Sequence, residues 1–275
     1  MSLYDDPLWP RAGGWPAPTG YADVVIVGVP TWSRSITPGS TNTTPAAVRE
    51  ALRRYSLTTG LVIADAGDLV DPDASPSEAA AAIAALDAGL VIALGGDNAA
   101  TVPVALGRRA DGLVTVDAHY DLRDGSSNGS PVRELLESGI TRVTQLGIEP
   151  LANSAAYAAR ADEWGIEVIP RRALQGQALD AVMLATIDDL GASRVHVDLD
   201  VDACDRAVAP GCPASVPGGL SALDLRNAAY AAGAHPSVVS LDLTEVDAAL
   251  DAPDGRTVRL VALCVLEAIR GYGTR

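Results

Sequence analysis

Leu113-Val114-Thr115-Val116 is followed directly by Asp117-Ala118-His119-Tyr120-Asp121. The apolar run is short and rich in β-branched residues, which is typical of a buried strand in a parallel sheet. If the strand runs on, Asp117, His119 and Asp121 share one face, because side chains alternate across a strand. Two carboxylates and an imidazole at a strand end suit a divalent metal ion. An acidic loop without a metal fits the same residues, so other stretches must decide between the two.

The composition limits the class of protein. The chain has 275 residues and a formal net charge of -15, which argues against nucleic acid or an anionic membrane surface as the main partner. Its three cysteines form no paired pattern and are typical of reduced thiols. No apolar stretch approaches the roughly 20 residues that span a bilayer, and residues 1–18 lack the features of a signal peptide. We therefore expect a cytoplasmic protein without a membrane segment.

Strands and helices are expected to alternate along nearly the whole chain. Short apolar runs predict strands at 24–29, 61–64, 90–94, 113–116, 142–146, 166–169, 193–202 and 238–243. Helical patterns lie between or after them, at 44–55, 75–86, 99–109, 131–138, 154–164, 178–190, 221–232 and 257–270. This alternation predicts an α/β fold with a mostly parallel central sheet of about eight strands, covered by helices on both faces. We expect one domain over residues 1–275, with residues 1–22 as an irregular N-terminal arm.

The candidate functional residues follow the carboxyl ends of predicted strands, which is where ligands bind in such sheets. One of these strands is itself acidic: from Val195 to Asp202, polar residues alternate with apolar ones. Period two puts His196, Asp198, Asp200 and Asp202 on one face. Stacked carboxylates on a buried strand are costly unless cations neutralise them. The alternative is an exposed edge strand, but the Val and Leu residues on the opposite face favour a buried one. Together with Asp117 to Asp121, this strand offers enough ligands for two metal ions.

Three motifs resemble those of the ureohydrolases, the family of arginase, agmatinase and formimidoylglutamase. Gly95-Gly96-Asp97-Asn98 is similar to the family's Gly-Gly-Asp-His, and Asp117 to Asp121 matches its Asp-Ala-His-x-Asp in full. Residues 198–210 resemble Ser-x-Asp-x-Asp-x-x-Asp-Pro-x-x-x-Pro, with Asp198 for the serine and Arg206 for the first proline. The likeness runs from about Val24 to the C-terminus. It implies a three-layer α-β-α arginase-like fold.

The resemblance also implies two Mn²⁺ ions per subunit. Asn98 stands where the family's Gly-Gly-Asp-His has its histidine, so the first ion is expected to bind weakly or not at all. Asp198 would support the ligands from one step back on its strand, and His196 is expected to be a core or supporting residue. The resemblance implies that Asp117 and Asp200 bind both ions. Asp121 and the residue at position 98 would complete the first site, and His119 and Asp202 the second.

The catalytic roles follow from the same resemblance. It implies that a metal-bridging hydroxide attacks the substrate and that Asp121 accepts a hydrogen bond from it and carries a proton to the leaving amine. Glu245 matches the glutamate that binds the cationic amidine or guanidine. A role as a loop cap is the alternative for Glu245.

The loop after Asp121 distinguishes the members of the family. Arginases and agmatinases usually carry a histidine in a His-Gly-x-Pro segment, where this chain has Asn128-Gly129-Ser130-Pro131. Asp121-Leu122-Arg123 and residues 126–131 look more like the corresponding segments of formimidoylglutamases. We therefore expect Arg123, Ser127 and Asn128 to bind the substrate, with Arg123 gripping a carboxylate through two hydrogen bonds. A surface ion pair with Asp124 or Glu134 is the alternative for Arg123.

The expected activity is hydrolysis of N-formimidoyl-L-glutamate to L-glutamate and formamide, a step of histidine degradation. Two alternatives stay open. The chain could be another ureohydrolase (a guanidinobutyrase, an agmatinase or an arginase-like enzyme), or a metal-poor relative without catalysis, marked by Asn98. The expected partner is a small amidine or guanidine, with no nucleic acid, and the family resemblance implies a homo-oligomer.

Overall fold

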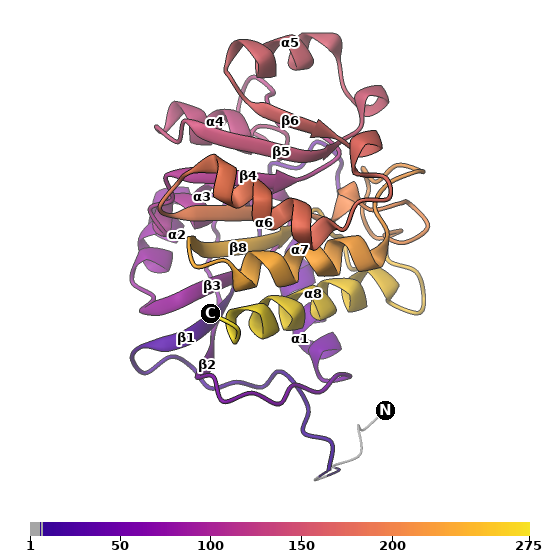
Figure 1. Cartoon of the computed structure of the whole chain (residues 1–275). Helices are drawn as coiled ribbons and strands as arrows, with labels where there is room; N and C mark the ends of the chain where they lie inside the picture. The colour runs from indigo at the N-terminus through magenta and orange to yellow at the C-terminus, as the bar shows by residue number, and fades with distance from the viewer. Residues whose placement is uncertain (1–5, 7) are drawn as a thin grey trace.

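The computed structural model describes residues 6 and 8–275 (Figure 1). Within them one sheet has eight strands in the order β2-β1-β3-β8-β7-β4-β5-β6, and every pairing is parallel. The predicted α/β fold is confirmed. The strands are β1 (Ala22–Val29), β2 (Ile63–Asp68), β3 (Ala88–Gly95), β4 (Gly112–Val116), β5 (Arg142–Ile148), β6 (Glu167–Pro170), β7 (Val195–Asp200) and β8 (Val238–Thr244).

Helices cover both faces of the sheet. On one face α8 packs against α1 and α7, and α7 packs against α6; on the other, α3 packs against α2 and α4. Figure 1 shows α6, α7 and α8 in front of the strands, with α5 beyond the sheet at the β6 edge. The helices are α1 (Thr44–Leu52), α2 (Pro76–Ala84), α3 (Thr101–Gly107), α4 (Pro131–Glu137), α5 (Ala155–Glu163), α6 (Leu179–Leu190), α7 (Ala222–Ala234) and α8 (Arg256–Tyr272).

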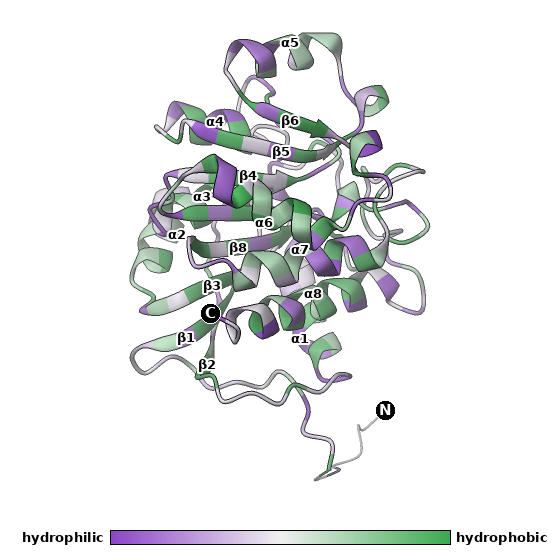
Figure 2. Cartoon of the chain, in the orientation of Figure 1, coloured by the Kyte–Doolittle hydropathy of each residue, from purple (hydrophilic) through white to green (hydrophobic). Residues whose placement is uncertain are grey.

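The core is formed by apolar strand residues that face helices on both sides. Ile26, Ile92 and Leu94 are almost completely buried, and hydrophobic positions are frequent along the central strands in Figure 2. Burying each such side chain contributes about 1.5–3 kcal/mol. Continuous apolar runs therefore predicted these strands correctly, because a parallel strand under two helix layers has no solvated face.

The predicted strand over 193–202 is too long at its end. β7 stops at Asp200, and Val201–Ala203 form a 3-10 turn. The turn forms because the Asp200 carboxylate Oδ1 accepts a hydrogen bond from the backbone N of Asp202 at 2.8 Å. The prediction that Asp202 shares a strand face with Asp198 and Asp200 is therefore wrong. Asp202 is placed by a turn.

The predicted N-terminal arm falls partly on residues 1–5 and 7, outside the described residues. Between Leu8 and Tyr21 the chain forms no helix or strand, although Arg11 bridges to Ser56 and Ala12 packs into the main core. The extent of the domain, residues 1–275, stays a prediction. Among the described residues, no helix combines the length and apolar character needed to cross a membrane.

Candidate metal centre

The candidate residues follow the carboxyl ends of four neighbouring strands at the centre of the sheet. Asn98 comes after β3, Glu245 after β8 and Asp117 after β4, while Asp200 ends β7. Because all four strands run in parallel, their ends meet at one edge of the sheet. The four segments, far apart in sequence, therefore converge there.

Two glycines let the segment after β3 approach its neighbours closely. A Cβ atom on Gly96 would lie 1.9 Å from the backbone oxygen of Thr31, and one on Gly95 would lie 2.7 Å from Thr244 Cγ2. Any side chain at either position would push the segment away from the site. The Gly-Gly pair thus allows Asn98, three residues after Gly95, to lie beside the other candidate residues.

The segment after β4 turns sharply. The strand stops at Val116, and Asp117 Oδ1 accepts a hydrogen bond from the backbone N of His119 at 2.6 Å. Asp121 has a φ of 51° and Glu245 a φ of 61°, in the left-handed region that non-glycine residues seldom adopt. Such conformations persist where the surrounding structure enforces them, often at functional sites. Asp117, His119 and Asp121 therefore converge through a turn. They do not lie on one face of a continued strand, because β4 ends before Asp117.

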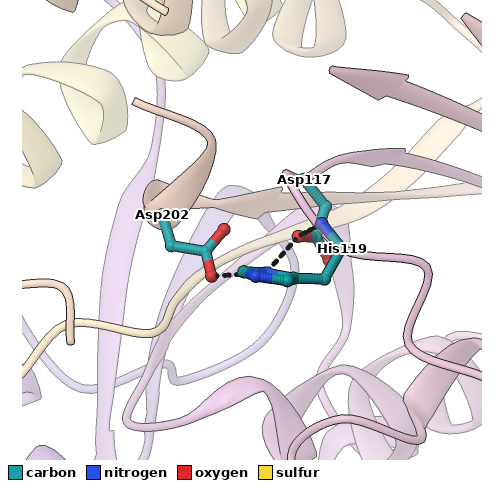
Figure 3. Close-up of side chains that lie close together, drawn as sticks. All are labelled: Asp117, His119 and Asp202. Atoms are coloured by element: carbon teal, nitrogen blue, oxygen red, sulfur yellow. Dashed lines mark hydrogen bonds and ion pairs between the residues drawn. The ribbon is translucent and has the colours of Figure 1, made fainter. Parts of the chain in front are cut away.

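The side chains form two groups that share one carboxylate. His119 Nδ1 lies 2.9 Å from Asp202 Oδ2 and 3.5 Å from Asp117 Oδ1 (Figure 3). Asp117, His119 and Asp202 each offer a ligand atom within 4.8 Å of the others, and so do Asp117, Asp121 and Asp200. Asp117 belongs to both groups, which is the arrangement of a pair of metal ions bridged by a common ligand.

The electrostatics of the metal-free cluster are unfavourable. Burial, and then the charge of Asp202, raises the pKa of Asp117 to about 6. Burial and neighbouring carboxylates also raise the pKa values of Asp121 and Asp200 well above the usual range. Burial alone would lower the pKa of His119, but Asp202 and Asp117 together raise it to about 12. A single imidazolium serves several carboxylates, so added cations would stabilise the cluster.

The residues present fit a pair of divalent ions. Asp117 Oδ2 is buried and has no hydrogen-bond partner among the described residues. A buried carboxylate oxygen without a partner is costly unless a cation binds it. The set of carboxylate oxygens with one imidazole nitrogen suits Mn²⁺.

Asn98 is fully buried, and both polar atoms of its side chain form hydrogen bonds. Its Nδ2 donates to Asp121 Oδ2 at 2.7 Å, while its Oδ1 accepts from the hydroxyls of Thr101 at 2.6 Å and Thr244 at 3.2 Å. The amide nitrogen, which cannot bind a cation, thus faces the cluster. Because hydroxyls can donate or accept, turning the amide over would keep its bonds to the threonines and present Oδ1 to a metal.

Glu245 is held by two asparagines. Its Oε1 accepts hydrogen bonds from the backbone N of Asn98 at 2.8 Å and from Nδ2 of Asn128 at 2.7 Å. Asn128 Oδ1 also accepts from the backbone N of Ile36 at 2.9 Å, so this residue ties the loop around Ile36 to Glu245. Burial, followed by the charges of Asp97 and Asp202, raises the pKa of Glu245 to about 8.

A second polar layer lies beneath the cluster. His196 Nδ1 lies 2.9 Å from Ser240 Oγ, and its Nε2 lies 3.2 Å from Asp242 Oδ2, with all three side chains buried. Asp198 Oδ1 accepts a hydrogen bond from Thr244 at 3.3 Å. Asp242 is not among the site residues predicted from the sequence. The alternating Ser240-Leu241-Asp242 of β8, paired in register with His196 to Asp198 of β7, is the signal that could have found it.

A pocket of about 640 Å³ opens over the centre. Arg123 lines it, with its stem against Gly129, and forms no ion pair with the described residues; Asp124 pairs with Arg160 instead. Ser127 does not line this pocket and faces a smaller recess. The predicted site residues that line the large pocket are His119, Asp121, Arg123, Asn128, Asp200, Asp202 and Glu245.

Comparison with known proteins identifies the family. The model of the arginase family matches residues 22–270. The chain belongs to the arginase family. The resemblance given by the three sequence motifs is therefore confirmed.

Several arginase-family relatives carry the name formimidoylglutamase. The one from Halobacterium salinarum is 30% identical over 90% of this chain and 88% of its own length. The one from Geobacillus thermodenitrificans is 35% identical over 82% and 76%. The match to the Halalkalibacterium halodurans protein, 33% identical over 66% of this chain, spans only 60% of that relative. A guanidinopropionase from Pseudomonas aeruginosa is 31% identical over 64% of this chain and 61% of its own length.

Solved structures of the family share the fold. Formimidoylglutamase from Bacillus subtilis superposes with a TM-score of 0.89 at 26% identity, covering 99% of this chain and 94% of that one. A Trypanosoma cruzi formiminoglutamase solved with Mn²⁺ superposes with a TM-score of 0.82 at 23% identity, covering 92% and 94%. The three-layer arginase-like architecture expected from the motifs is confirmed.

Proposed function

We propose that this chain hydrolyses N-formimidoyl-L-glutamate to L-glutamate and formamide. The main support is the charge arrangement of the pocket: carboxylates lie together with His119 at the metal centre, while Arg123 lines the wall without an ion pair to the described residues. A substrate with a cationic amidine at one end and a carboxylate at the other matches this arrangement. The formimidoylglutamases among the relatives favour this amidine over others.

The metal ligands remain those given by the motifs. Asp117 and Asp200 would bind both ions, with Asp121 and Asn98 Oδ1 for the first and His119 and Asp202 for the second. When bound, two Mn²⁺ would supply Lewis acidity and lower the pKa of water toward neutrality. Asn98 can take part only after its amide turns over, which weakens the first site.

Glu245 would bind the amidine. Its Oε1 is held by Asn98 and Asn128, and its Oε2 accepts no hydrogen bond from the described residues. The raised pKa of Glu245 means that the buried carboxylate lacks a cationic partner in the free protein. An amidinium would provide that partner and keep Glu245 ionised.

Asp121 would move the proton. Its carboxylate lies at the metal centre and lines the pocket, so it would accept a proton from the attacking water. That proton would pass to the substrate nitrogen that leaves as the amine of glutamate. Arg123 would hold the substrate carboxylate and so fix the position of the amidine carbon.

The experiment is a turnover panel with formimidoylglutamate, arginine, agmatine and guanidinobutyrate in the presence of Mn²⁺. We expect release of formamide from formimidoylglutamate at a kcat/KM well above that for the guanidines. Release of urea from guanidinobutyrate as the main activity would instead favour a guanidino-acid hydrolase. This is the second candidate function, because one of the relatives is a guanidinopropionase. No turnover of any substrate, together with little bound metal after incubation with Mn²⁺, would favour the metal-poor, non-catalytic alternative.

A further inference from the structure

A second arginine, Arg160, lines the same pocket as Arg123. It lies on α5, at the edge of the fold beside β6, and reaches back toward the loop that follows Asp121. Its Nη1 donates to the backbone oxygen of Leu122 at 2.6 Å and to Asp124 Oδ1 at 2.8 Å. The pocket therefore carries two guanidinium groups on its walls, from two separate elements.

The guanidinium of Arg160 is held in place from several sides. It lies 5.7 Å from the ring centroid of Tyr157 and 5.4 Å from that of Trp164. These contacts, together with the hydrogen bond to Leu122, restrict the side chain before any ligand arrives. A group ordered in advance loses less conformational entropy on binding. Arg160 thus resembles a prepared binding group more than a freely moving surface arginine.

Arg160 still has donors to offer. Both of its hydrogen bonds use Nη1, while Nε and Nη2 donate to no other described residue. The Nε–Nη2 edge of a guanidinium matches the two oxygens of a carboxylate. Asp124 does not block this edge, and its side chain is 83% exposed, so water weakens its pairing with Arg160. A second anionic group can therefore bind beside it.

We propose that Arg160 binds the second carboxylate of a dicarboxylic amidine, the γ-carboxylate of N-formimidoyl-L-glutamate, while Arg123 binds the α-carboxylate. The assignment rests on the proposed function. The α-carboxylate is one carbon from the reacting nitrogen, and Arg123 is two residues from Asp121 at the metal centre. The γ-carboxylate lies farther along the substrate, which suits an arginine from α5. A guanidino acid with one carboxylate would leave one of the two arginines without a partner.

Substrate selection would then depend on a residue outside the three motifs. A dicarboxylic amidine would form charge-assisted contacts with both Arg123 and Arg160, whereas a monocarboxylic one would form such a contact with only one of them. With a monocarboxylate, the half-buried Arg160 would have no anion to bind and would forgo binding energy that the dicarboxylate gains. Monocarboxylic analogues should then bind more weakly even though the reacting group is unchanged.

The test compares N-formimidoyl-L-glutamate with N-formimidoyl-L-glutamine, whose γ-group has the same shape and no charge. Arg160→Gln should lower kcat/KM for the glutamate compound about 10–100-fold, mainly through KM, and change that for the glutamine compound less than about twofold. Arg160→Lys should recover part of the loss. Arg172→Gln, at an exposed arginine that does not line the pocket, is the matched control and should behave as the unmodified protein.

The outcomes separate the two proposals. An equal loss on both compounds would mean that Arg160 only supports the loop through Leu122, and an unchanged kcat/KM would mean that it contacts no substrate; either result overturns the subsite. Circular dichroism and Mn²⁺ content check that each variant is folded and loaded. If the unmodified protein hydrolyses neither formimidoyl compound, the proposed function itself is wrong, and the subsite is refuted with it.

Discussion

Replacing Asn98 by histidine tests the metal centre most directly. Asn98 is fully buried, and its amide nitrogen lies 2.7 Å from Asp121 Oδ2. An imidazole there would supply a nitrogen ligand that divalent ions such as Mn²⁺ bind better than an amide oxygen. We expect Asn98→His to bind Mn²⁺ more tightly by roughly 10–100-fold, the range typical of changes around metal ligands.

The same change should destabilise the metal-free protein. The hydroxyls of Thr101 and Thr244 donate to Asn98 Oδ1 and would lose that acceptor. A net loss of about 0.5–1.5 kcal/mol for each hydrogen bond gives about 1–3 kcal/mol in all. Bound Mn²⁺ should offset this loss, because a ligand that binds only the folded state stabilises it. The gain in melting temperature on adding Mn²⁺ should therefore be larger for the variant.

The assay is calorimetric titration with Mn²⁺, with melting curves recorded in a chelator and in Mn²⁺. Asn128→His is a matched control, because Asn128 lines the same pocket but binds Glu245 and the Ile36 backbone. That control should leave the number and affinity of bound ions unchanged. Equal affinity and stoichiometry for Asn98→His and the unmodified protein would place Asn98 outside the metal ligands, and the reasoning would fail.

Three further predictions can be checked with the same preparations. Asp200→Asn and Asp202→Asn should each abolish turnover at saturating Mn²⁺, while Asp198→Asn should keep activity within roughly 10–100-fold of normal; near-normal activity of Asp202→Asn would shift the ligands to Asp198 and Asp200. Arg123→Ala should lower kcat/KM for formimidoylglutamate about 10–150-fold at unchanged metal content, and full activity would make it an ordinary surface residue. The pKa of Glu245 is about 8 in the folded state against 4.5 as the ordinary value, so its stabilising contribution at low pH is lost as the pH rises through this window. Melting temperatures in a chelator should fall from pH 4.5 to 8, and a rise over that range would contradict the burial of an unpaired carboxylate.

The sequence carried most of the information about the elements. Every predicted strand and helix is present, because apolar runs and helix caps are local signals. Ser221 and Asp224, for example, form the capping box that begins α7. The gathering of Gly95–Asn98, Asp117–Asp121, Asp200 and Glu245 at one sheet edge was also predictable, since parallel strands share their carboxyl end.

What the sequence did not reveal depends on contacts between distant segments. The left-handed conformations of Asp121 and Glu245 are enforced by their surroundings and leave no mark in composition. The turn that places Asp202 depends on one side-chain hydrogen bond. The alternation of polar and apolar residues up to Asp202 predicted a continued strand there and gave no sign of this turn. Arg160 belongs to an alanine-rich helix that shows no local sign of lining a pocket.

The strand order has a consequence for synthesis of the chain on the ribosome. β8 follows every other strand in the chain, yet it lies between β3 and β7 in the middle of the sheet. Until residues 238–244 have been made, the growing chain must keep two half-sheets with unpaired inner edges, which invite pairing with other chains. Glu245 arrives with the same strand. The amidine-binding carboxylate is therefore the last part of the site to be made, after the metal ligands that follow β4 and β7, two strands that pair directly with each other.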